Sequence, residues 1–361
     1  MLTNITRTLT IKDKGFSLKS LIQHKFFALL LKLTIVIVLS FILYHQIFGR
    51  EDITIQKLVE EFVARMSWQN IPLIMLVLVL MPLNWFFETQ KWRWLMQKIE
   101  PITLGEALRI VLVGLTFSLF TPNRVGEYGG RIMMVSKEKR LMAIFAIMVG
   151  ASSQWIVLVV GGWWAMIATF YWGFIPVSNM VLGILITLGL LIFLILLLVY
   201  FNLPVLVNFC LRFRWTKKWA GQMQQSLGQP YTNQELLIAL VYSSTRYLIY
   251  SFQYLCLLYF FGFEAGIIST FLGIQIVYLL QTGIPLPPST GLLARGNLAL
   301  LIFGYLTVSS HASTAILAST FGLWLINVVL PALIGAFFIL KFGWDNKKKK
   351  EQLVQEPCSS H

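Results

Sequence analysis

Charged residues are scarce in this sequence. Of its 361 residues only 12% are Asp, Glu, Lys or Arg, whereas 57% are hydrophobic, and the mean hydropathy is +0.74. Soluble domains carry about 25% charged residues. The composition therefore excludes a soluble globular protein and predicts an integral membrane protein.

Cysteine and histidine are also rare, with three and four residues. The three cysteines, Cys210, Cys256 and Cys358, do not form a disulfide framework. The cysteines and the scattered histidines are also not spaced like the ligands of a metal site. The sequence also lacks a Gly-rich phosphate loop, paired histidines at helical spacing and a nucleophile elbow. We therefore expect no metal, no cofactor and no enzymatic activity, although Glu127 could serve as an acid or base.

The net charge of +14 comes mostly from short basic blocks beside apolar runs. That placement is typical of a topology signal, because cytoplasmic loops of membrane proteins are rich in Lys and Arg. It argues against a nucleic-acid partner. We predict a multi-pass protein of the cytoplasmic (inner) membrane, with a cytoplasmic basic N-terminal segment (1–25), a transmembrane domain (26–341) and a cytoplasmic C-terminal tail (342–361).

The sequence contains about eight apolar segments, beginning with a run at 26–48. A helix needs about 20 residues to cross a hydrocarbon core of roughly 30 Å. Most of the segments reach that length, which predicts an all-α polytopic bundle with about six full spans. The basic and aromatic residues Lys91 to Trp94 are interpreted as an anchor at the membrane interface, and Glu88 as interfacial too.

Two of the segments are interrupted by Gly, Pro and charged residues. The first, at 104–135, has basic blocks on both sides and limbs too short to span, so it predicts a re-entrant hairpin that opens to the cytoplasm. The second, at 265–306, lacks basic flanks and should open to the outside. Two hairpins of opposite sense predict an inverted repeat with halves at roughly 70–201 and 235–341. The residues expected to shape the two loops are Thr121, Pro122, Gly126, Pro285, Pro287, Pro288 and Gly291.

Several charged side chains fall within these apolar segments. Each costs about 2.5 to 3.5 kcal/mol on insertion scales, so an intramembrane charge indicates a functional site. Four arginines against one carboxylate leave a positive excess, and the guanidinium fork suits phosphate. Arg131 could instead extend to the interface, and Glu127 could be a structural counter-ion or couple protons. The predicted substrate-binding residues are Asn123, Arg124, Glu127, Arg131, Arg246 and Arg295.

A positively charged site within apolar segments fits a ligand that has an anionic head and an apolar body. This indicates a membrane lipid as the substrate. We expect translocation of an anionic or zwitterionic phospholipid, or of a polyprenyl-phosphate-linked lipid, between leaflets. A small-anion transporter, which would need a closed and water-filled cavity, is one alternative. A non-transporting membrane partner of a cell-envelope enzyme is another, and a homo-oligomer is compatible with each.

The stretch from Thr121 to Tyr128, with a second polar stretch at 285–295, resembles the lysylphosphatidylglycerol synthase transmembrane-region family. The hallmark of that family is Thr-Pro-x-Arg/Lys-x-Gly-Glu before an apolar half-helix. The resemblance covers about 30–341 and implies a flippase-like domain with inverted repeats. In some members this domain translocates aminoacylated phospholipid or handles polyprenyl-linked sugars.

Two departures from the family pattern change the expected substrate. A soluble aminoacyl-transfer domain does not follow the last apolar segment, so we expect no synthesis of lysyl-lipid. The family commonly has Pro-Gly-Gly and then Glu in the second loop, whereas this chain has Pro288 to Gly291 followed by Arg295. A head group with a net negative charge fits that more basic loop better than a cationic lysyl lipid.

Overall fold

A computed structural model of the chain describes residues 55–119, 121, 125–202, 231–282, 288–306 and 312–340. All of these residues belong to one compact unit, which begins at Ile55. The predicted first span at 26–48, the N-terminal segment and the C-terminal tail therefore lie outside the described residues.

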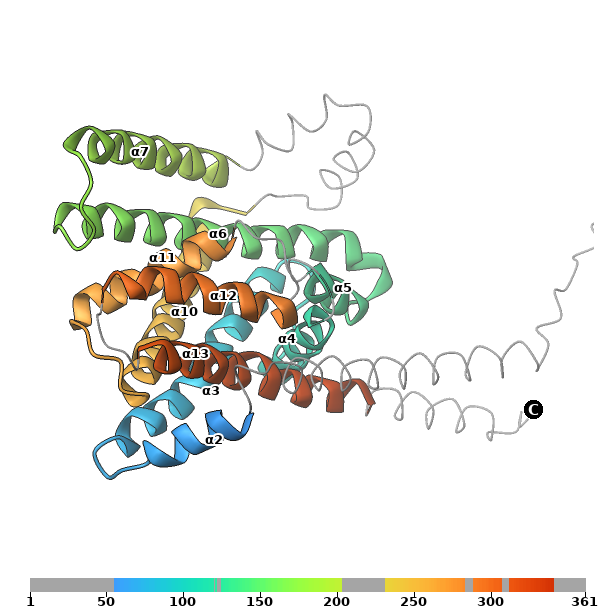
Figure 1. Cartoon of the computed structure of the whole chain (residues 1–361). Coiled ribbons are helices and arrows are strands. Elements are labelled where there is room, and N and C mark those ends of the chain that lie inside the picture. The colour runs from blue at the N-terminus through green and yellow to red at the C-terminus, as the bar shows by residue number, and fades with distance from the viewer. Residues whose placement is uncertain are drawn as a thin grey trace, which may run out of the picture. The chain divides into compact units, whose positions relative to one another are not determined.

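Every regular element in the described ranges is helical, which confirms the predicted all-α class. The helices, shown in Figure 1, are α2 (Ile55–Ala64), α3 (Ile71–Met96), α4 (Leu104–Ser118), α5 (Val125–Met133), α6 (Arg140–Tyr171), α7 (Asn179–Phe201), α10 (Asn233–Phe260), α11 (Ile267–Thr282), α12 (Pro288–Gly304) and α13 (Ala312–Trp324). A 3-10 turn, η2 (Lys137–Lys139), precedes α6. A π-helical turn, η3 (Leu325–Val329), follows α13 within one continuous helix that ends at Leu340.

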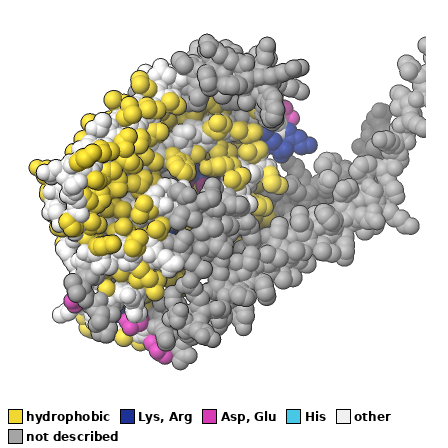
Figure 2. All heavy atoms as spheres, turned by 45° about the horizontal axis from the view of Figure 1, so that its top comes forward, with side chains coloured by type: hydrophobic (Ala, Val, Ile, Leu, Met, Phe, Trp, Pro, Cys, Tyr) yellow, Lys and Arg dark blue, Asp and Glu magenta, His cyan; other side chains and the backbone are white. Residues whose placement is uncertain are grey.

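Four helices of the described chain are long and apolar enough to cross a membrane. They are Ile71–Met96, Lys137–Tyr171, Asn179–Phe201 and Ala312–Leu340. The face in Figure 2 agrees, since hydrophobic side chains cover it broadly and charged ones show mainly at its edges. The helix α10 has 28 residues but is not among the four, and its middle carries the polar run Ser243 to Arg246. The structure thus supports a membrane-embedded helical protein, while the count of six spans stays a prediction.

The helix α10 is central to the bundle, because it packs along α3 and also contacts α6, α11 and α13. Its buried face includes Tyr254, Leu257, Leu258 and Phe260. The helices α6 and α11 approach closely at Gly162, where an added Cβ would lie 2.5 Å from the Leu279 Cβ. Small residues permit such close helix contacts in membrane proteins. These contacts bring the polar faces of several helices to one central region.

The helix α7 differs from the rest because most of its apolar surface is exposed. It lies beside α6 (Figure 1), and only Gly189 and Tyr200 are buried. Gly189 lies under the Trp163 ring, and the Trp163 indole N–H donates to the Leu185 carbonyl over 2.9 Å. An apolar helix exposed on this scale fits a lipid environment.

The helices α4 and α5 form a short hairpin. They have 15 and 9 residues, or about 22 and 14 Å, and are both shorter than a hydrocarbon core. The Thr121 hydroxyl accepts from the Gly126 N–H over 2.6 Å and so supports the start of α5. An added Cβ at Gly126 would lie 2.3 Å from the Phe117 carbonyl oxygen. Thr121 and Gly126 thus shape this turn.

The second predicted hairpin corresponds to α11 and α12, which pack against each other. Residues 283–287, which include Pro285 and Pro287, lie outside the described residues. Pro288 is the first residue of α12 and Gly291 also lies in that helix, so their assignment to the loop is corrected. Proline is favoured in the first helical turn because it has no N–H to leave unpaired. The inverted relation of the two hairpins stays a prediction.

Candidate functional site

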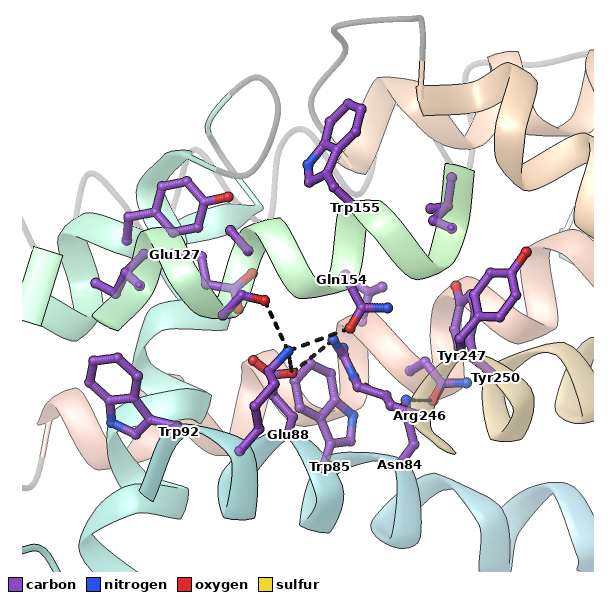
Figure 3. Close-up of a pocket in the computed structure, with 18 of the residues that line it drawn as sticks. Asn84, Trp85, Glu88, Trp92, Glu127, Gln154, Trp155, Arg246, Tyr247 and Tyr250 are labelled. Atoms are coloured by element: carbon purple, nitrogen blue, oxygen red, sulfur yellow. Dashed lines mark hydrogen bonds and ion pairs between the residues drawn. The ribbon is translucent and has the colours of Figure 1, made fainter. Parts of the chain in front are cut away.

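A cavity of about 330 Å³ lies within the bundle (Figure 3). Its lining comes from α3, α5, α6, α10, α11, α12 and the η3 region of the last helix. The charged residues among those that line it are Glu88, Lys91, Glu127, Arg131, Arg246 and Arg295. Charged groups far apart in the sequence therefore meet at one site.

The helix α3 supplies one polar face of this cavity. Asn84, Glu88 and Lys91 follow one another at i, i+4 and i+7, so they share one side of the helix. All three are buried, whereas the neighbouring Leu83 and Phe86 are exposed. The face that carries them packs on α10, which brings Arg246 within reach.

Glu88 is the centre of the charged cluster. Its side chain is buried at 3% relative exposure, and its oxygens contact three cations. The Lys91 Nζ lies 2.9 Å away, the Arg131 Nη2 2.8 Å and the Arg246 Nη1 3.0 Å. A buried carboxylate is tolerated only when paired and hydrogen-bonded. Glu88 thus holds together cations from α3, α5 and α10.

The two arginines of this cluster have further partners. The Arg131 Nη2 also donates to the Glu127 carboxylate, one helical turn earlier on α5. The Arg131 guanidinium lies 5.4 Å from the Trp92 ring centroid, and that of Arg246 lies 5.1 Å from Trp85. Cation–π contacts of this length stabilise a desolvated guanidinium. Both arginines are thus fixed in orientation.

An amide bridge extends the cluster to the last helix. The Arg246 Nε donates to the Asn84 Oδ1 over 3.1 Å, and the Asn84 Nδ2 donates to the Asn327 Oδ1 over 3.0 Å. Asn327 lies in the π-helical turn η3 and is buried. Turns of this kind are frequent at functional sites, because they turn a side chain away from the regular helical position. The turn connects the last helix to the charged cluster.

Lys91 joins the cluster to α6. Its Nζ lies 3.3 Å from the Ser243 hydroxyl and 3.4 Å from the Gly150 carbonyl oxygen. Ser243 in turn contacts the Ser153 hydroxyl of α6 over 2.8 Å. The ammonium group thus has polar partners from α3, α6 and α10, as a buried lysine requires.

Arg295 has a different environment. Its Nε donates to the Gln281 Oε1 over 2.7 Å, and its Nη1 donates to the Tyr250 hydroxyl over 2.9 Å. Both partners are neutral, and among the residues that the structure describes no carboxylate lies within ion-pair distance of Arg295. The guanidinium is therefore oriented without being neutralised.

The structure brings together four of the six residues predicted to bind substrate. Glu127, Arg131, Arg246 and Arg295 all line the cavity. Asn123 and Arg124 lie outside the described residues, as does Pro122. Arg131 is buried at 6% relative exposure and points toward Glu88 and Glu127, so the alternative that it extends to the interface is wrong.

The sequence analysis missed Asn84, Glu88, Lys91 and Asn327. Glu88, Lys91 and Trp92 are buried in the cavity wall, although the sequence indicated only an interfacial role for them. Their spacing along one face of an apolar helix was the signal that could have identified them. Within the described ranges no cluster of His, Cys, Asp and Glu is arranged to hold a metal ion.

No family model, curated protein or solved structure matches this chain. The resemblance of the stretch from Thr121 to Tyr128 to the lysylphosphatidylglycerol synthase transmembrane region therefore stays a hypothesis.

Proposed function

We propose that this protein binds the anionic head group of a membrane lipid in the cavity and moves that lipid between the two leaflets. The observation that carries this proposal is the charge of the lining. Four cationic side chains, Lys91, Arg131, Arg246 and Arg295, stand against the two carboxylates Glu88 and Glu127. A positive excess inside an apolar helical bundle calls for an anion as its partner.

The size of the cavity supports a head group as the occupant. Pockets for small molecules have volumes of about 300 to 1,000 Å³, and this one, at about 330 Å³, is at the lower limit. That volume suits a phosphorylated head group without its acyl chains. The acyl chains would remain in the surrounding lipid, against the apolar outer faces of the helices.

The two helix pairs that the sequence predicts as hairpins both contribute to the cavity. The α4–α5 pair supplies Glu127 and Arg131, and the α11–α12 pair supplies Gln281 and Arg295. Transporters with inverted repeats place their site between such interrupted segments and expose it alternately to the two sides. We infer the same cycle here, in the cytoplasmic membrane, with the two pairs moving in turn.

A vesicle assay tests the proposal. The full chain is reconstituted with phosphatidylglycerol that carries a fluorophore, and outer-leaflet fluorescence is quenched chemically to report exchange between leaflets. We expect exchange with the wild type and, at equal amounts of folded reconstituted protein, at least about tenfold slower exchange with Arg246→Gln, since removing one member of a buried charge pair costs several kcal/mol. The matched control is Arg109→Gln, because Arg109 is exposed on α4 and is not part of the cavity lining.

Two results would contradict lipid translocation. Exchange at the rate of protein-free vesicles would rule it out, and equal rates for wild type and Arg246→Gln would show that the cavity does not carry it. If the same vesicles accumulate radioactive phosphate without exchanging lipid, the small-anion transporter replaces the lipid mover.

A further inference from the structure

We infer that the cavity selects a phosphate-bearing head group that has no amine, and that Arg295 binds its phosphate. This inference rests on the proposed function and specifies its substrate class. It follows from two properties of the lining: its carboxylates are already engaged, and one cation of the described lining has only neutral partners.

The carboxylates of the cavity are already engaged. Glu88 contacts three cations, and Glu127 accepts from Arg131. An ammonium head group offers only donors, so it would have to compete with side chains that are held in place by the fold. It would also add a further cation to a lining that already has an excess of two. The positive lining thus repels head groups that carry an ammonium, and this repulsion provides specificity.

Arg295 is the site for the phosphate. A guanidinium has five N–H donors, and the hydrogen bonds to Gln281 and Tyr250 use the Nε and the Nη1 atoms. Among the described residues the Nη2 group has no hydrogen-bond acceptor, so its two donors can bind a phosphate oxygen, and charge-assisted bonds of this type are strong. The phosphate would also neutralise the one cation of the described cluster that lacks a carboxylate.

The rest of the head group would extend from Arg295 toward the Glu88 cluster. In Figure 3 Trp85 and Trp92 lie on the Glu88 side of the cavity, and Tyr247 lies next to Tyr250. The rings of these residues suit the apolar faces of a glycerol or a sugar. The substrate class is therefore a phosphodiester lipid with a neutral polyol head.

Native mass spectrometry of the purified full chain tests this selectivity. The protein is given equimolar phosphatidylglycerol and phosphatidylethanolamine with identical acyl chains. We expect phosphatidylglycerol to exceed phosphatidylethanolamine in the bound fraction by about tenfold, the size of one unfavourable charged contact. Because both lipids carry the phosphate, Arg295→Gln should weaken the binding of both by about tenfold, Arg295→Lys should keep part of that binding, and Arg109→Gln should leave it unchanged.

The outcomes separate this inference from the proposed function. Equal binding of the two lipids by the wild type, or undiminished binding of both lipids by a folded Arg295→Gln variant, overturns the inference even if vesicles exchange lipid. Selective binding without lipid exchange supports the inference and overturns translocation. Displacement of phosphatidylglycerol by an equal concentration of glycerol 3-phosphate would support the same head-group chemistry and identify a soluble phosphate ester as the occupant.

Discussion

The two ends of the cavity hold their cations in different ways. At one end Lys91, Arg131 and Arg246 converge on Glu88, so each positive charge contacts a buried negative one. At the other end Arg295 is oriented by Gln281 and Tyr250, and neither neutralises it. The first arrangement holds helices together, whereas the second keeps its charge for a ligand.

This difference decides what a substitution should change. Removing one member of a buried ion pair leaves the others unpaired, and the penalty falls on stability. Removing a cation that has only neutral partners relieves an uncompensated charge, so the penalty falls mainly on binding. Variants at the two ends should therefore separate folding from function.

The largest effect is expected for Glu88→Gln. The glutamine keeps the shape of the side chain but leaves Lys91 and Arg246 without their carboxylate, so we expect a loss of about 3 to 5 kcal/mol of stability. Unfolding of the detergent-solubilised protein by heat or denaturant measures it. The control is Glu138→Gln on η2, where Glu138 is exposed and the expected change is within about 0.5 kcal/mol. Equal stability of the two variants would show that Glu88 does not organise its end of the cavity.

A smaller loss is expected when the α4–α5 hairpin is forced apart. Gly126→Ala places a Cβ 2.3 Å from the Phe117 carbonyl oxygen, and such overpacking costs about 1 to 3 kcal/mol. Gly129→Ala in the same helix meets nothing within 4 Å and should stabilise α5 by up to about 1 kcal/mol. Denaturant unfolding of both variants gives the difference. If the two alanine substitutions changed the stability equally, α4 and α5 would not be closely packed at Gly126.

The sequence was sufficient for the helical class and for part of the site. Arg246 and Arg295 were identifiable because a charge inside a long apolar run is unusual on its own. Glu88 and Lys91 were not, because the basic and aromatic residues that follow them match the pattern of a membrane interface. Their burial depends on α6 and α10 packing over that part of α3, which is a tertiary contact. The pairing of Asn84 with Asn327 spans 243 positions and depends on the π-helical turn, so local periodicity could not indicate it.

Arg295→Gln should affect stability far less than Glu88→Gln does. It removes two hydrogen bonds to neutral partners, worth about 1 kcal/mol each, while it also removes a charge that no carboxylate balances. We expect a net loss of about 1 kcal/mol or less in the same unfolding assay. A loss as large as that of Glu88→Gln would mean that the two ends are alike and that Arg295 is structural.

The smallest effect is expected at Glu106, an exposed carboxylate whose contribution to stability can be compared with that of the buried Glu88. Glu106 begins α4 in a capping box with Thr103, and the hydrogen bond from the Thr103 backbone N–H, followed by that from its hydroxyl, lowers the pKa of Glu106. A pKa that is lower in the folded state adds stability above the ordinary glutamate value of about 4.3, and this stability is lost as the pH falls through the folded-state pKa. Glutamine preserves the box but not the charge, so Glu106→Gln should cost about 0.3 to 1 kcal/mol at pH 7 and low salt. Unfolding at pH 7 and at pH 3 should show that difference shrink toward zero, and a constant difference would assign the effect to packing instead of charge.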